Sequence, residues 1–221
     1  MKKIYFIIVS IFFVIVSSYS QDNTDDTAVD NSKRTKNGWD YYSEGRYRES
    51  IAALELEKKY FPERINIYVI MAWCYRELKE FDNMEKISLE GLKIQPTDSR
   101  VHRNLAEAYY FQGKYGLAIG SFENYLKYKY TPGADPYLSL LYGYLGICYY
   151  NTEQFRKADI ALSFSNFLKR NNQEVIYYLA LTKEKLKEYK KSFDLYSFLL
   201  QLNPNHQKGI EGLNRVKGNI Q

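Results

Sequence analysis

The stretch LAEAYYFQGKYGLAIGSFENYL, residues 105–126, decides the fold of this chain. Its apolar side chains recur at spacings of three and four, which is typical of a helix buried along one face. Gly113 and Lys114 interrupt the pattern and Tyr115 resumes it, so the stretch predicts two helices joined by a short turn. A turn this short forces the two helices to pack antiparallel, as a hairpin.

A similar pattern of an aromatic residue after a turn, often followed by a proline, recurs along the chain with a period of 34 residues. Pro62, Pro96 and Pro204 each follow an aromatic residue by fifteen positions, and similar aromatic residues occur at Tyr115 and Phe155 without a matching proline. A fixed period of this length is the signature of a repeat protein. The alignment predicts repeats at 31–64, 65–98, 99–132, 139–172 and 173–206, an insertion loop at 133–138, and a capping helix at 207–221.

Stacking explains why the hairpins would repeat. One hairpin cannot bury its apolar face alone, but stacked hairpins can, each touching only its neighbours. The last repeat would still expose an apolar edge, and the final segment carries apolar residues at helical spacing that can cover it: Ile210, Leu213, Val216 and Ile220. We therefore expect an all-α fold, an α-solenoid of about five hairpins plus a C-terminal capping helix.

The residues at equivalent positions resemble the tetratricopeptide repeat (TPR) family. The third repeat carries Leu105-Ala106, Tyr109, Gly113-Lys114-Tyr115, Ala118 and Phe122, and the fourth carries Leu145-Gly146, Tyr149, Phe155 and Ala158. The family signature places aromatic and small residues at these offsets. The chain departs from the signature at Ser50, Met84 and Ser192, where the family has Ala, and at Lys183 and Arg34, where it has an aromatic residue.

The N-terminus has the three-part pattern of a secretory signal. Lys2 and Lys3 precede the apolar run Ile4–Val16, and the small residues Ser18 and Ser20 suit cleavage after position 20. The run is shorter than the roughly 20 residues that span a bilayer. We expect a signal peptide at 1–20, a polar disordered spacer at 21–36, and an exported protein of the periplasm or cell envelope. The alternative is an uncleaved N-terminal anchor.

Composition argues against catalysis, metal binding and nucleic-acid binding. The formal net charge is +5, of which Lys2 and Lys3 supply two. Basic and acidic residues are therefore nearly balanced, which does not indicate nucleic-acid binding. His102 and His206 lack partners at ligand spacing. No motif for phosphate binding or nucleophilic catalysis occurs. We expect a protein that is not an enzyme and needs no cofactor.

Cys74 and Cys148 occupy the same slot of two repeats that are not adjacent. Helices pack roughly 8–10 Å apart, so this placement puts the two sulfur atoms too far apart for a disulfide. We expect two free, buried thiols.

The resemblance implies that the first helices of the repeats line a concave, partner-binding face. Both tryptophans fall there, and Trp, Tyr and Arg are enriched in binding hot spots. The expected binding residues are Trp39, Tyr42, Trp73, Arg76, Arg103, Tyr110, Phe111, Ile147, Tyr150, Tyr177 and Leu181. The alternative is that some of these rings, especially Tyr42, Tyr110 and Tyr150, pack between repeats.

The expected partner is another protein, bound as an amphipathic helix or an extended segment with apolar anchors. Some family members clamp acidic C-terminal tails with Lys and Asn, but Val69, Trp73, Arg103 and Glu107 occupy the corresponding positions here. A small apolar ligand or lipid in the same groove is the main alternative, and a self-assembling subunit is another. Membrane contact is expected only through an uncleaved signal.

Overall fold

The computed structural model describes residues 36–129 and 135–220. The predicted signal peptide, most of the spacer, the start of the first repeat and residues 133–134 of the insertion lie outside the described residues. The described residues from position 37 onward belong to one compact unit. Its described part contains eleven α-helices and no strand, so the all-α prediction is confirmed.

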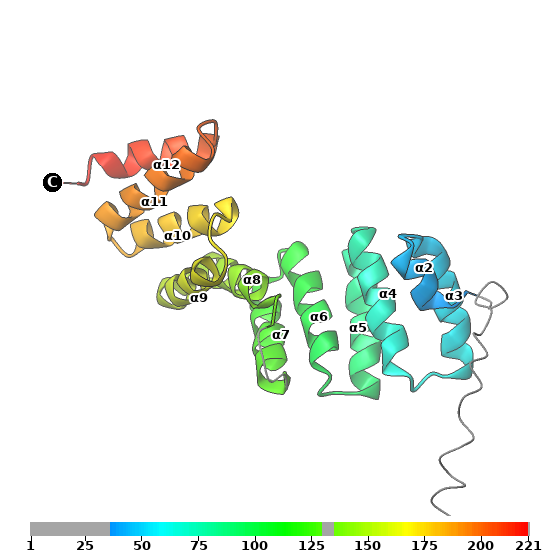
Figure 1. Ribbon diagram of the computed structural model, residues 1–221. Helices are drawn as coiled ribbons and strands as arrows, with labels where there is room; N and C mark the ends of the chain where they lie inside the picture. Colours follow the sequence, from blue (N-terminus) through cyan, green and yellow to red (C-terminus); the bar gives the residue numbers. More distant parts are fainter. Residues whose placement is uncertain (1–35, 130–134, 221) are drawn as a thin grey trace, which may run out of the picture. The chain divides into compact units, whose positions relative to one another are not determined.

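The helices pair as consecutive hairpins (Figure 1). The pairs are α2 (Gly38–Ser43) with α3 (Tyr47–Tyr60), α4 (Ile65–Glu77) with α5 (Phe81–Ile94), α6 (Ser99–Phe111) with α7 (Tyr115–Tyr128), α8 (Leu138–Asn151) with α9 (Phe155–Leu168), and α10 (Gln173–Lys185) with α11 (Tyr189–Leu202). A final helix, α12 (Gln207–Lys217), packs against α11 and α10. The predicted solenoid of five hairpins and a cap is therefore confirmed.

Each hairpin turns through one residue with left-handed backbone, two positions before the second helix. Gly45 and Gly113 both have φ of 74° there, a conformation open to glycine without a steric penalty. Lys79, Glu153 and Lys187 adopt φ of 58°, 60° and 62° at the same place. The residue that follows the turn donates its amide back to the first helix, so the turn closes the helix end.

Small residues let the two helices of a hairpin approach closely. A Cβ added to Gly146 would lie 2.5 Å from Cγ of Leu162, and one added to Gly38 would lie 2.3 Å from Cγ of Leu54. Ser50 lies in this contact too, and its hydroxyl donates to the carbonyl of Gly38 at 2.6 Å. Two of the departures from the family signature, Ser50 and Ser192, thus hydrogen-bond the first helix of their own hairpin.

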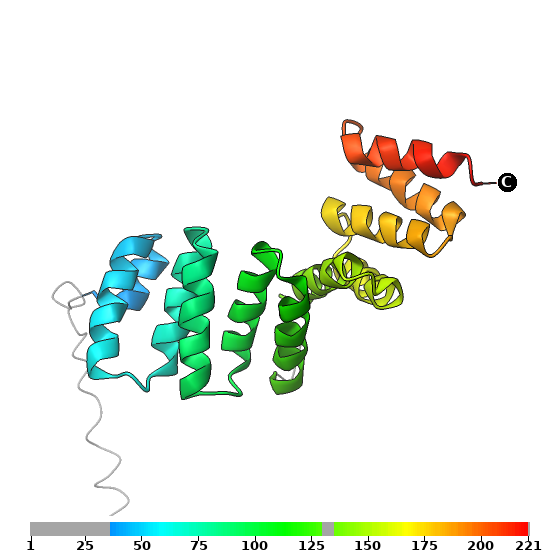
Figure 2. The ribbon, with the colours of Figure 1, turned by 180° about the vertical axis from the view of Figure 1, so that it is seen from behind.

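The first helices form the tightly stacked layer of the unit. α2, α4, α6, α8, α10 and α12 each come within 8 Å of the next first helix between Cα atoms. Among the described helices, no second helix comes that close to another second helix. Figures 1 and 2 show from opposite sides how the hairpins follow one another in chain order. This first-helix layer is where the sequence analysis expected the partner-binding face.

The capping helix closes the apolar end of the last hairpin. Val216 is fully buried, Ile210 and Leu213 are half-buried, and Gly212 packs against the ring of Tyr196. The absence of a side chain at Gly212 is required, because an added Cβ would lie 2.3 Å from Cζ of that ring. The outward residues of α12 are polar, as a terminal repeat of a solenoid requires.

Cys74 and Cys148 are free and fully buried, as predicted. Burial raises the pKa of the Cys74 thiol and raises that of Cys148 to about 12, so neither sulfur is a ready nucleophile. Within the described ranges, the helices lack the length and apolar run needed to cross a bilayer.

Candidate functional site

Three aromatic rings from the first two hairpins cluster on the first-helix layer. Trp39 and Tyr42 lie on α2 and Trp73 on α4, with ring centroids between 5.6 and 6.4 Å apart. The indole of Trp73 is held in place, because its Nε1 donates to Oδ1 of buried Asn104 on α6 at 3.1 Å. Trp39 is 50% exposed. This Trp cluster (Trp39, Tyr42 and Trp73) therefore presents an oriented apolar surface to solvent.

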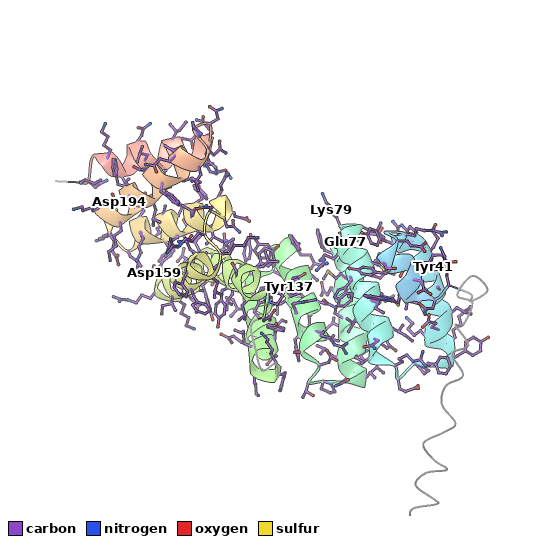
Figure 3. The ribbon with its side chains drawn as sticks, in the orientation of Figure 1. Tyr41, Glu77, Lys79, Tyr137, Asp159 and Asp194 are labelled. Carbon is purple, nitrogen blue, oxygen red and sulfur yellow. The ribbon has the colours of Figure 1, made fainter. Side chains whose placement is uncertain are left out.

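A charged group lies beside the Trp cluster. Nη1 of Arg76 on α4 is 3.4 Å from Oε2 of Glu107 on α6, and Nε of Arg103 is 3.8 Å from Oε1 of the same carboxylate. Glu107 is buried, so its negative charge depends on these two guanidinium groups for compensation. Glu77 adds a second carboxylate 2.9 Å from Arg76. Figure 3 shows Glu77 at the end of α4.

The electrostatics of this group keep Arg76 charged. Burial alone would lower its pKa, but the carboxylates of Glu107 and Glu77 outweigh burial and raise the pKa above its usual value. The guanidinium of Arg103 also lies 4.8 Å from the ring centroid of Tyr137, a cation–π contact. Nε of Arg103 is buried without a hydrogen bond. The two arginines and the two carboxylates therefore form a charge-balanced group beside the Trp cluster.

A second aromatic cluster joins α6 to α8. Tyr110 stacks on Tyr144 with ring centroids 4.3 Å apart, and Phe111 lies 5.2 Å from Tyr110 and 5.7 Å from Tyr144. Burial raises the pKa of Tyr110, and raises that of Tyr144 to about 12. Phe111 is 42% exposed and stacks on Phe81 at 4.7 Å. In this Tyr110 cluster (Tyr110, Phe111 and Tyr144), Phe111 offers the exposed ring, while the two tyrosines mainly pack between repeats.

The same contact recurs between α8 and α10. Tyr150 lies 5.4 Å from Tyr178, and these residues occupy the slots that Tyr110 and Tyr144 hold in the preceding repeats. Tyr177 is half-buried and lies 5.6 Å from both Tyr178 and His206. Leu181 is also half-buried. The C-terminal part of the layer is therefore more closely packed than the Trp cluster.

Ile147 does not belong to the binding surface, contrary to the sequence expectation. Its exposed fraction is 2%, and it lies in the core cluster with Leu145 and Cys148. The same offset is buried in α6, where Glu107 is 4% exposed, because an interior first helix packs between two neighbouring first helices. Trp39 holds this offset in α2 and is 50% exposed. A partner cannot reach Ile147 without unfolding the repeat.

Sequence reasoning missed Asn104, Tyr144 and Tyr178. An Asn inside an otherwise apolar helix is a signal for a buried polar contact, since the amide needs a partner when it leaves water. Tyr144 and Tyr178 lie 34 residues apart in equivalent slots, so the repeat register could have paired each with a Tyr of the preceding first helix. Of the expected residues, Trp39, Tyr42 and Trp73 form the Trp cluster, Tyr110 and Phe111 belong to the Tyr110 cluster, and Arg76 and Arg103 share the carboxylate of Glu107.

The two histidines serve the fold. Nε2 of His102 lies 2.9 Å from the carbonyl oxygen of Pro96, and Nδ1 of His206 accepts from the amide of Gly209 at the start of α12. Among the described residues, no group of three or more His, Cys, Asp or Glu could hold a metal ion.

A pocket of about 280 Å³ opens near the turn between α4 and α5 and is lined in part by Phe81, the ring on which Phe111 stacks. Its lining residues are Lys79, Glu80, Phe81, Asp82, Asn83 and Gln112, most of them polar. None of the residues expected to bind a partner lines it. The residues of this pocket do not suit an apolar ligand.

Comparison with known proteins identifies the fold but not a specific relative. No protein-family model matches the chain, and no curated protein matches it. Among solved structures, MamA aligns with a TM-score of 0.65 and 14% identity over 79% of this chain and 99% of its own. YrrB, a TPR protein with an unusual peptide-binding site, aligns with a TM-score of 0.66 and 14% identity over 76% and 83% of the two chains.

A third solved structure is the APC/C hetero-tetramer Cut9-Hcn1, with a TM-score of 0.65 and 18% identity over 81% of this chain. The alignment spans only 35% of that longer chain. These likenesses, together with the consecutive helical hairpins, show that the chain has the TPR fold.

Proposed function

We propose that this TPR solenoid is a non-catalytic scaffold that binds a segment of another protein along the first-helix layer. The observation that carries the proposal is the pair of exposed rings, Trp39 and Phe111, on the same layer of first helices as the group formed by Arg76, Arg103 and Glu107. Exposed apolar rings with a polar surround usually mark a contact site. TPR proteins of known structure include one with a peptide-binding site, which supports a polypeptide as the ligand.

The chemistry of the surface narrows the kind of segment. The Trp cluster and Phe111 would each accept an aliphatic or aromatic anchor, and the charge-balanced group of Arg76, Arg103, Glu77 and Glu107 would receive a polar side chain. An amphipathic helix or an extended segment can supply this alternation. Because Trp73 and Asn104 are already hydrogen-bonded, little ordering would be needed at the centre of the site on binding.

The test is crosslinking capture from cell-envelope extracts with a double variant, Trp39→Ala and Phe111→Ala. Both rings are exposed, so we expect the variant to fold and to lose the captured protein. Leu56→Ala is the matched control, because Leu56 is 55% exposed but lies on second helix α3. Retention of the same partner by a folded double variant would overturn the proposed site. Recovery of a bound lipid or small molecule in place of a protein would favour the alternative ligand.

We also propose that the protein acts in the cell envelope after export. The supporting observation is the basic, apolar and small-residue pattern of residues 1–20. Mass spectrometry of protein recovered from a periplasmic fraction tests this, and we expect a mature N-terminus at Gln21. Full-length protein in the cytoplasmic fraction would contradict export, and full-length protein in the membrane fraction would indicate an uncleaved anchor.

A further inference from the structure

The outward face of α9 differs from every other second helix. Two of its apolar side chains project almost entirely into solvent, Ile160 at 72% exposure and Phe167 at 74%. Phe164 and Leu168 extend the same stripe. The exposed residues of the whole helix are Arg156, Lys157, Ile160, Ser163, Phe164, Phe167 and Leu168. The structure describes all of α9, and none of its exposed residues is acidic.

The fold does not require these apolar residues. All five second helices are 14 residues long and start with an aromatic residue, so their positions can be compared directly. The position of Ile160 is held in the other four by Ala52, Lys86, Gly120 and Asp194. The position of Phe167 is held by Lys59, Lys93, Lys127 and Gln201. The large apolar side chains at these two positions, which the other second helices lack, therefore need an explanation other than stacking.

Positive charge flanks the stripe at both ends. Arg156 and Lys157 lie at the start of α9, and Lys169 and Arg170 follow its end, all of them exposed. Asp159 is the one acid within residues 154–172, which the structure describes in full, and Lys183 neutralises it at 2.8 Å. The surface thus combines protruding apolar groups with an excess of four cations; we call it the α9 ridge (Ile160, Phe164, Phe167, Leu168 and the four flanking cations).

The charge arrangement selects among possible occupants. A second copy of the chain, packed ridge to ridge, would bring two sets of cations together, which is unfavourable. An apolar stripe flanked by Lys and Arg is the pattern of a helix that lies in the interface of a bilayer with acidic lipids.

We propose that the α9 ridge docks on the surface of an anionic phospholipid bilayer. Ile160 and Phe167 would enter the headgroup region, and the four cations would contact lipid phosphates. The sequence analysis expected membrane contact only through an uncleaved signal, and the contact proposed for α9 is independent of that N-terminal segment. It also leaves the first-helix layer, on the other helices of the hairpins, open to a protein partner.

Binding of the full-length chain to vesicles tests the proposal. We expect sedimentation with vesicles of phosphatidylcholine and phosphatidylglycerol, weakened by salt, and much less with phosphatidylcholine alone. The double variant Ile160→Ser, Phe167→Ser should bind roughly tenfold more weakly, because both apolar contacts are lost. Leu56→Ser is the control, since Leu56 occupies the position of Phe164 on α3. Equal loss in the control, or no loss in the double variant, would overturn the proposal.

The cations are tested separately. The double variant Lys169→Gln, Arg170→Gln should bind the anionic vesicles about 25-fold more weakly, because each lost cation reduces the affinity about fivefold. Lys86→Gln with Lys93→Gln, both exposed on α5, changes the net charge equally and should have little effect. Equal effects in the two pairs would show non-specific attraction and overturn the assignment to α9.

A local probe separates the ridge from the N-terminal apolar run. Both native cysteines are buried, so Ser163→Cys provides a selective site for a polarity-sensitive fluorophore on the ridge, and Lys93→Cys provides a control site on α5. Anionic vesicles should blue-shift only the probe at position 163. A shift with polyglutamate but not with vesicles would identify an acidic protein surface as the occupant and overturn the proposal.

Discussion

At the scale of single residues, buried polar groups carry information that the apolar pattern does not. Ser50 stands where the TPR signature has Ala, and its hydroxyl both donates to the carbonyl of Gly38 and lies 3.2 Å from Sγ of Cys74. Asp98 is buried at the start of α6 and accepts from the amides of Arg100 and Val101. Ser50 therefore links α3 to α2, and Asp98 caps the first turn of α6.

Ser50→Ala should lower the free energy of unfolding by about 1 kcal/mol, because a buried hydrogen bond to Gly38 is lost. Urea unfolding followed by circular dichroism measures the change. The exposed Ser163→Ala is the control and should stay within about 0.5 kcal/mol of wild type. A more stable Ser50→Ala would mean that the hydroxyl is only tolerated in the hairpin contact.

Asp98 should make stability depend on pH in acid. Burial alone would raise its pKa, but hydrogen bonds from the Arg100 side chain and the two amides outweigh burial, so the folded pKa lies below the ordinary 3.8. The contribution is therefore complete above the ordinary value and is lost as the pH falls through the folded pKa. Asp98→Asn should be less stable at pH 7, by about 1 kcal/mol, and lose less stability between pH 5 and pH 3.

Unfolding of wild type, Asp98→Asn and the exposed control Asp82→Asn across that range checks the Asp98 prediction. If wild type and Asp98→Asn lose the same stability between pH 5 and pH 3, Asp98 is not the source of the pH dependence. A control that behaves like Asp98→Asn would show that the effect comes from net charge.

At the scale of helices, repeat spacing was sufficient to predict the hairpins. The period of 34 and the interrupted apolar pattern determine where helices turn, since turn geometry and the pairing of adjacent helices are local. Spacing could not predict which residue at a given offset is open to solvent. Ile147 and Trp39 hold the same offset, but Ile147 is buried and Trp39 is 50% exposed. α8 packs between α6 and α10, whereas α2 contacts only α3 and α4 among the described helices, so exposure depends on packing beyond one hairpin.

Gly146 and Gly120 form a matched test of helix contact. Gly146→Ala should cost about 1–3 kcal/mol, because its Cβ would overlap Leu162 and even approach the backbone nitrogen of that residue. Gly120→Ala meets nothing within 4 Å and should stabilise α7 by about 0.5–1 kcal/mol, through the lower helix propensity of Gly. Urea midpoints of the two variants should therefore move in opposite directions; a shift in the same direction would contradict the packing at α8.

At the scale of the whole molecule, stability should be distributed along the repeats and not concentrated in one centre. The described buried apolar residues form three clusters, one of which joins Ala180, Tyr196 and Val216 at the C-terminal end. In such an array each repeat depends chiefly on its neighbours. The capping helix is then essential for the last hairpin and remote from the first.

Val216→Asp should open the C-terminal end selectively, because it places a charge in a fully buried position. Hydrogen exchange should accelerate in α10, α11 and α12 while α4 and α5 stay protected. Lys217→Asp is the control for charge, since Lys217 is exposed on the same helix. Uniform loss of protection along the chain would show that the solenoid unfolds as one cooperative unit.

The Trp cluster also has an optical consequence. Trp39 and Trp73 are the only two tryptophans of the chain, and their rings lie 6.4 Å apart across the first two hairpins. Intrinsic fluorescence excited at the indole band therefore reports on one end of the molecule, whereas far-ultraviolet ellipticity sums over all the helices. A difference between the two melting curves would reveal stepwise unfolding without any added label, and a fluorescence change on mixing with a partner would place that partner at the N-terminal hairpins.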